Sequence, residues 1–156
     1  MSDFTKFGGN TPRVVVYKSE SHKLHQAFPV KAPINIHAGN PVAITNEGTI
    51  ELLTTANEAN YLGIAVTDNN NPAYKDSANA DSVEVTVAVQ GFMIINAIAE
   101  TALSAGPVEI GTGMDATNHF TRFKAFTSAD AATRPVNFIS LTKASVKDEL
   151  IQVLCK

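Results

Sequence analysis

Cysteine is almost absent from this sequence of 156 residues, in which Cys155 is the single example. One cysteine excludes an intramolecular disulfide, and a chain of this length buries roughly 70% of its unfolded surface without needing one. No apolar run approaches the ~20 residues of a membrane-spanning helix, and residues 1–10 lack the pattern of a secretory signal. We therefore expect a globular protein that is made in a reducing cytoplasm and does not bind membranes.

Charged residues are also sparse, at 17% of the sequence, and they are unevenly distributed. Residues 1–33 hold five basic and two acidic side chains, whereas residues 34–156 hold seven basic and thirteen acidic ones. Residues 1–33 are therefore expected to form a positively charged N-terminal arm, which either docks on an acidic surface or stays a solvated tail. Five dispersed basic residues do not form the clustered stripe that binds phosphates, so nucleic acid is not an expected partner.

Alternating β-branched residues dominate the remainder of the chain. In residues 82–90 (SVEVTVAVQ) a valine stands at every second position, which is the period of a half-buried antiparallel strand. Similar patterns predict strands at 13–17, 41–45, 61–67, 136–142 and 149–154. Gly48 is expected to turn a hairpin from 41–45 into 49–53, and Gly91 to bend the chain ahead of a strand at 92–96.

Helical patterns are short. Residues 96–104 (NAIAETALS) are predicted to form two helical turns, and Thr55 with Glu58 has the spacing of a capping box. Residues 68–81 are rich in Asn, Asp, Ser and Pro, which predicts a long exposed loop. The predicted fold class is therefore mainly β, with short helices.

Four segments of the first half recur in the same order in the second half: 38–44 at 105–110, 54–60 at 127–133, 61–67 at 137–142, and 83–87 at 150–154. Insertions between the copies fall between the predicted strands. Because neither copy alone would bury much, we expect a compact β-barrel or sandwich built from two similar strand-rich halves. The predicted organisation is an extended arm (1–33) followed by one β-rich domain (34–156), with halves of about 34–96 and 97–156.

Residue types that bind metals are present but poorly grouped. The four histidines are His22, His25, His37 and His119, and no cysteine or acidic cluster accompanies them at ligand spacing. Asp68, Asp76 and Asp81 share one predicted loop without the spacing of an EF-hand, so a polar loop is favoured over a Ca²⁺ site. We expect no metal and no other cofactor.

Catalytic motifs are likewise not found. The sequence has no Gly-x-Ser-x-Gly elbow, and Gly111-Thr112-Gly113 lacks the lysine of a phosphate loop, so this segment is predicted to be a turn. Cys155 is interpreted as a small apolar strand residue and not as a nucleophile. Phe120, Phe123 and Phe126 are expected in the core, with an exposed sticky face as the alternative. The sequence therefore predicts a protein that is not an enzyme.

Several of the repeated segments carry a resemblance to a known family. The runs are INIHAGNPVAI, NYLGIAVTD, VEVTVAVQGFMI, ALSAGPVEI and ELIQVLCK, which together fall within residues 34–156. This order of an Ala-Gly-x-Pro-Val turn, a Gly-Ile-Ala-Val strand and a Val-x-Val-x-Val strand ending in glycine resembles the capsid cement, or head decoration, proteins of tailed bacteriophages. The second half departs from the pattern at 137–140, which reads Asn-Phe-Ile-Ser.

The resemblance implies a structural role in the virion. Such a protein would bind the outer surface of the assembled capsid, contact the lattice of the major capsid protein and stabilise the shell. It would form a homo-oligomer, with a trimer expected first and a monomer as the alternative. Contacts with the capsid are expected from the N-terminal arm, at Arg13, Tyr17, Lys18 and Phe28.

Two other classes of function remain open at this point. The first is a different virion part, such as the base of a head fibre or a tail component, which would bind in few copies. The second is a small enzyme or ligand-binding barrel, which would require the 68–81 loop or the histidines to converge in a pocket.

Overall fold

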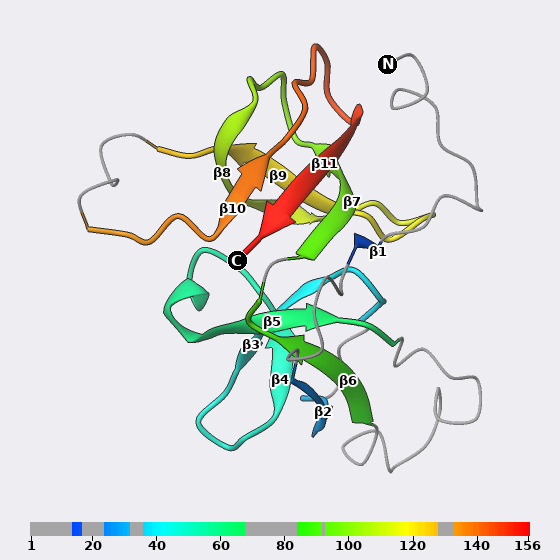
Figure 1. The fold of residues 1–156 in the computed structure, drawn as a ribbon, viewed down its shortest axis with the longest axis vertical. Helices are drawn as coiled ribbons and strands as arrows, with labels where there is room; N and C mark the ends of the chain where they lie inside the picture. The colour runs from blue at the N-terminus through cyan, green and yellow to red at the C-terminus, as the bar shows by residue number, and fades with distance from the viewer. Residues whose placement is uncertain (1–13, 17–23, 32–35, 68–83, 92, 128–132) are drawn as a thin grey trace. The chain divides into compact units, whose positions relative to one another are not determined.

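The structure, a computed structural model, describes residues 14–16, 24–31, 36–67, 84–91, 93–127 and 133–156. Within these residues the chain is mainly β, which confirms the predicted fold class (Figure 1). The elements in chain order are β1 (Val14–Val16), β2 (His25–Pro29), β3 (Pro41–Ile44), β4 (Ile50–Leu52), the 3-10 helix η2 (Glu58–Asn60), β5 (Tyr61–Ala65), β6 (Glu84–Val89), β7 (Met93–Ala99), β8 (Gly106–Met114), β9 (Thr121–Ala125), β10 (Phe138–Ser140) and β11 (Leu150–Cys155).

The chain divides into two compact units, one of residues 20–91 and the other of residues 1–19 and 92–156. In the first unit five antiparallel strands lie in the order β2-β6-β5-β3-β4. Just after β2, Val30 bridges Ile50 of β4 in parallel, and the Lys31 N–H donates to the Ile50 carbonyl over 2.9 Å. This bridge joins the two outer strands, and we call the resulting ring the first barrel.

The second unit contains the ring β7-β11-β10-β8-β9, which we call the second barrel. Its neighbouring strands are antiparallel, except that β7 and β9 pair in parallel at Ile98 with Arg122 and at Ala99 with Phe123. Strand β1 adds to β7 beside this closure, opposite Ile94 and Ile95. Residues assigned from the sequence to the arm thus supply strands to both units, β1 to the second and β2 to the first.

The two barrels have the same topology. Each strand order becomes the other when five is added to the strand number, and the parallel closure falls at the same place. Individual hydrogen bonds recur as well: the Leu53 N–H donates to Pro41 as Phe126 does to Pro107, and the Gln90 N–H donates to Leu62 as Lys156 does to Asn137. The repeat detected in the sequence is therefore a duplicated barrel.

Strand register corrects one of the sequence matches. Ile64 pairs with Pro41 and Ala88 in the first barrel, and Ile139 pairs with Pro107 and Leu154 in the second, so Ala88 is equivalent to Leu154. Matching 83–87 to 150–154 was therefore one residue out. Such a slip exchanges the two faces of a strand, and large apolar residues on both faces of β11 conceal it.

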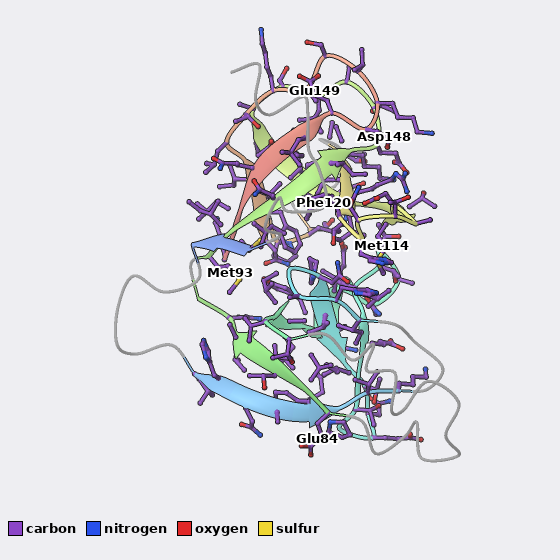
Figure 2. The ribbon with its side chains drawn as sticks, turned by 90° about the vertical axis from the view of Figure 1, so that its right-hand side faces the viewer. Glu84, Met93, Met114, Phe120, Asp148 and Glu149 are labelled. Atoms are coloured by element: carbon purple, nitrogen blue, oxygen red, sulfur yellow. The ribbon has the colours of Figure 1, made fainter. Side chains whose placement is uncertain are left out.

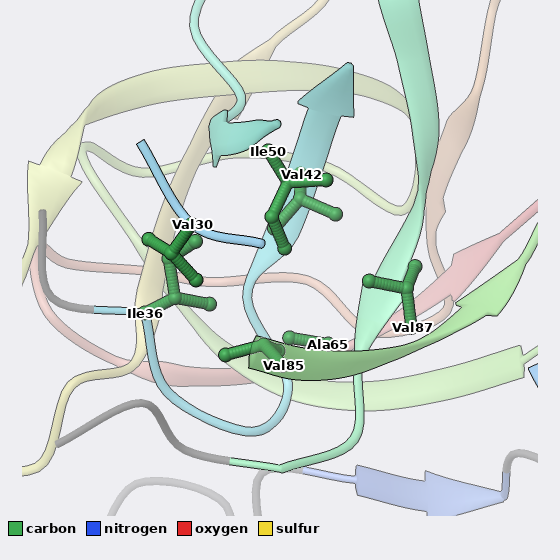
Figure 3. Close-up of a cluster of buried hydrophobic side chains, with 7 residues drawn as sticks. All are labelled: Val30, Ile36, Val42, Ile50, Ala65, Val85 and Val87. Carbon is green, nitrogen blue, oxygen red and sulfur yellow. The ribbon is translucent and has the colours of Figure 1, made fainter. Parts of the chain in front are cut away.

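The core of the first barrel is aliphatic. Seven side chains from its strands and loops converge inside the ring (Figure 3): Val30, Ile36, Val42, Ile50, Ala65, Val85 and Val87. The valines at alternate positions of β6 thus face inward, as the period of two predicted. At Gly63 a Cβ would overlap the carbonyl oxygen of Ala88, so this position of β5 requires glycine.

The second barrel has an aromatic core at the equivalent place. Phe138, which stands where the first barrel has Gly63, lies with its ring centroid 5.1 Å from that of Phe123, and both are buried. Phe120, labelled in Figure 2, is also buried, so the expectation is confirmed for Phe120 and Phe123, whereas Phe126 is half-buried. Cys155 is fully buried in β11, as expected for a small apolar strand residue.

Two local predictions are wrong. Residues 96–99 belong to strand β7 and not to a helix; residues 95–99 are buried on both faces of this strand, so the sequence shows no period of two there. Residues 111–113 lie inside β8 and not in a turn between elements, since the glycines allow a bulge there and Gly113 has φ 65°. The hairpin through Gly48 is confirmed, with φ 82° and a bond from the Thr45 N–H to the Thr49 carbonyl.

Candidate interaction surface

An open groove lies at one end of the second barrel. There the loop after β7 meets the loop after β10, since Leu103 and Ala144 exchange two backbone hydrogen bonds of 2.9 Å. The groove has a volume of about 700 Å³ and is lined by residues 102–107, 125–126, 136 and 143–144. Its lining is apolar apart from Ser104 and Lys143. It is therefore suited to apolar groups and offers one cation.

Phe126 forms part of the groove wall and is half-buried. The guanidinium of Arg134 lies over its ring, with 4.9 Å between Cζ and the ring centroid. Arg134 also forms an ion pair of 2.9 Å with the buried carboxylate of Glu109, which Lys124 approaches to 3.6 Å. The carboxylate beside the groove is thus already paired, and it fixes the arginine that covers Phe126.

A row of apolar residues continues from the groove around the outside of the second barrel. Pro107 pairs with Ile139, Ile139 with Leu154, and Leu154 with Ile94, so these residues are cross-strand neighbours on one face. The residues adjacent to them along the strands are buried, except Gly106, whereas Pro107 is exposed and the other three are half-buried. We call these four residues the apolar row.

The same positions of the first barrel are also mostly apolar but are covered. Pro41, Ile64 and Ala88 correspond to Pro107, Ile139 and Leu154, and all three are buried. Near the apolar row of the second barrel, by contrast, Leu141 is 45% exposed only two residues after Ile139. The duplication therefore has one covered and one solvent-accessible version of the same face.

Of the four residues proposed from the sequence as capsid contacts, the structure describes Phe28, which does not line this groove. Phe28 is in β2 of the first barrel, where it is half-buried and packs against the core cluster. Arg13, Tyr17 and Lys18 lie outside the described residues. Sequence reasoning singled out Phe126 among the groove residues, but it assigned all three phenylalanines to the core.

The histidines that the structure describes do not form a cluster. His25 is exposed in β2, His37 is buried near Asn40, and His119 stands at φ 60° before β9. His22 and the aspartates of residues 68–81 lie outside the described residues. Across the described part of the chain, no group of three or more His, Cys, Asp or Glu side chains is placed to hold a metal ion.

Comparison with known proteins adds no relative. Neither a protein-family model nor a curated protein sequence matches the chain. No helix among the described residues is both long enough and apolar enough to span a membrane. The features of the described residues that bear on function are the duplicated barrel and the apolar face of its second copy.

Proposed function

We propose that the protein is a capsid cement, or decoration, protein that binds the outer surface of an assembled bacteriophage capsid and stabilises it. The observation that carries the proposal is the duplicated barrel, together with the segments from which it is built. The Ala-Gly-Asn-Pro-Val run leads into β3 and the Ala-Gly-Pro-Val run into β8, while the Gly-Ile-Ala-Val run overlaps β5 and the Val-x-Val-x-Val run overlaps β6. The segments that resemble the family thus contribute to β3, β5 and β6 of the first barrel and to β8 and β11 of the second.

Two barrels in one chain suit a lattice of repeated subunits. A chain with two folded units gains avidity when each unit contacts a neighbouring subunit through its own surface, and many modest contacts then add up over a shell. Because such a protein binds the assembled shell and not its separated subunits, it stabilises the assembly by linkage. The proposal requires neither catalysis nor a cofactor. A homotrimer at a symmetry axis of the shell is the expected oligomer.

Co-sedimentation of the full-length protein with expanded, undecorated capsids of its own phage tests the proposal. Copies per shell are counted at saturation, and the particles are then heated with and without the protein. Saturable binding in hundreds of copies, with shells that survive to a higher temperature, is the expected result. Binding in a few copies would instead indicate a vertex or tail component, and no binding would exclude a virion role on that capsid.

The proposed contacts of the N-terminal arm are tested by substitutions and not by a deletion. Removing residues 1–30 would also remove β1 and β2, so a loss of binding would only report damage to the barrels. The variant Arg13→Ala/Lys18→Ala removes two cations of the arm and is expected to weaken capsid binding several-fold. Lys75→Ala, which removes one cation outside the arm, is the control, and equal binding by both variants would exclude a contact at Arg13 and Lys18.

A further inference from the structure

We infer that the groove of the second barrel receives an apolar, acidic segment of a capsid subunit. This inference rests on the proposed function and specifies which surface makes the contact. It concerns the groove together with the apolar row that continues from it. Three properties of this face support the inference: its exposure, its size and its charge.

Exposure separates the second barrel from the first. The apolar face is the same in both copies by strand register, yet Pro41, Ile64 and Ala88 are buried while Pro107 is exposed. An exposed and continuous apolar face on a folded protein marks a surface that binds a partner. The duplication thus supplies its own comparison, and it identifies the second barrel as the one with an accessible apolar face.

The size of the groove indicates what enters it. A volume of about 700 Å³ lies within the range of pockets that enclose small apolar groups, roughly 300–1,000 Å³. Alanine, glycine and proline form much of the lining, so the backbone of a partner segment can approach closely. One or two aliphatic or aromatic side chains of that segment would occupy the space between Phe126 and Ala144. Buried side chains of this kind dominate the free energy of most protein interfaces.

The charge of the groove surface indicates which charged groups the partner carries beside its apolar side chains. Lys143 lies at the groove, and no carboxylate of the described residues pairs with it. Lys156 is close by, since its N–H donates to Asn137, the neighbour of the lining residue Val136. Residues 92–156 hold six basic and six acidic residues, whereas residues 20–91 hold three basic and eight acidic ones, so the second barrel lacks the acidic excess of the first unit. A segment with carboxylates next to its apolar side chains therefore complements this surface.

The test is co-sedimentation with expanded, undecorated capsids, using the full-length protein and two pairs of exposed substitutions. Ala105→Glu places a carboxylate in the groove, and Ala56→Glu makes the same change on an exposed alanine of the first barrel. Lys143→Glu reverses the groove cation, and Lys147→Glu reverses a lysine of the same loop outside the groove. The melting temperature of each free variant shows whether it is folded.

Ala105→Glu and Lys143→Glu are expected to weaken capsid binding by about tenfold or more, with both controls within about twofold of wild type. Binding of the wild type should fall as salt rises, and it should fall less steeply for Lys143→Glu. If the wild type binds capsids and all four variants bind them equally well, the inference is wrong and the proposed function stays intact. No binding by the wild type would overturn both.

Sedimentation velocity of the free proteins tests the alternative occupant of the groove, a second copy of this chain. If Ala105→Glu and Lys143→Glu dissociate an oligomer that the two control variants retain, the groove holds a second copy of this chain. That outcome would overturn the assignment to a capsid subunit. An unchanged oligomeric state, together with the selective loss of capsid binding, is the result expected for the capsid segment.

Discussion

Single positions show how the two barrels diverged while keeping one backbone plan. Glu109 of β8 is equivalent to Ala43 of β3, since each pairs with the matching residue of the next strand, Lys124 or Glu51. Both positions are buried, but one holds a carboxylate with two cations and the other a methyl group. The fold therefore does not require the ion pair, and its role is to hold Arg134 over Phe126.

Removing one partner of this buried ion pair should lower the free energy of unfolding more than removing both partners. Arg134→Ala leaves the Glu109 carboxylate buried with only the more distant Lys124, and we expect it to lower the free energy of unfolding by about 2 kcal/mol. Glu109→Ala/Arg134→Ala should be more stable than Arg134→Ala alone, because Ala43 shows that a small residue fits this position. Urea unfolding of the single and double variants measures the coupling, and strictly additive losses would contradict the argument.

A second residue-scale feature is a reversed pair of charges. Lys31 and Glu51 form an ion pair of 3.1 Å in the first barrel, and the equivalent positions in the second hold Glu100 and Lys124. Hydrogen bonds from Thr112 lower the pKa of Glu100, with a smaller contribution from the charge of Lys124. A hydrogen bond from Asn57, followed by one from Lys31, lowers the pKa of Glu51. Both carboxylates therefore stabilise the folded state when ionised.

The sign of the pH dependence follows from these lowered pKa values. Each carboxylate contributes its stabilisation above its ordinary pKa of 4.5, and the contribution is lost as the pH falls through the lower pKa of the folded state. The wild type should therefore lose stability from about pH 5 downward, and Glu100→Gln should lose less over the same range. Urea unfolding at several pH values tests this, with Glu47→Gln, an exposed carboxylate in the β3–β4 turn, as the control.

At the scale of elements, period-two patterns located the strands that have large residues on one face only. The valines of β6 and the Gly-Ile-Ala run of β5 were found in this way, and so was the order of the repeat. Strands β2 and β9 were not predicted, because HQAFP and TRFKA hold few β-branched residues and rely on pairing with their neighbours. Tertiary pairing thus determines the strands that local preference does not.

One side-chain bond is repeated between equivalent elements and can be tested in both. The Thr67 hydroxyl accepts from the Thr86 N–H over 3.0 Å, and the Thr142 hydroxyl accepts from the Gln152 N–H over 3.1 Å. Thr67→Ala and Thr142→Ala should each lower the free energy of unfolding by about 1 kcal/mol, since each leaves one strand N–H without its acceptor. Thr54→Ala, on an exposed loop, is the control. A measurable loss in one barrel only would contradict their equivalence.

At the scale of the whole molecule, the sequence predicted two similar halves but not that each half closes its own ring. Closure depends on single contacts, Val30 with Ile50 and the short parallel pairing of β7 with β9, which leave no pattern in the sequence. The groove was also not predicted from the sequence. Its lining residues come from several segments between residues 102 and 144. Most of these residues are Ala, Gly or Pro, which individually do not indicate a binding site. Out-of-phase apolar residues, Ile139 and Leu154, were the one available indication.

The duplication itself can be tested in solution by amide hydrogen exchange. Equivalent backbone amides donate equivalent hydrogen bonds in the two barrels, in the pairs Lys31 and Glu100, Leu53 and Phe126, and Val66 and Leu141. Both members of each pair should exchange more slowly than an unstructured amide by about a hundredfold or more, because exchange requires the ring to open. Ala56 and Lys147, exposed residues outside the strands, serve as the expected fast-exchanging references.

The pair at the closure of each ring is the most informative. Lys31 donates to Ile50 and Glu100 donates to Phe123, over 2.9 and 2.8 Å, and these bonds join the strands that complete each barrel. If both rings are closed, these two amides are protected together with the strand interiors. If Lys31 exchanges as fast as Ala56 while Glu100 is protected, the first unit is an open sheet of five strands, and only the second copy of the duplicated fold is a closed barrel.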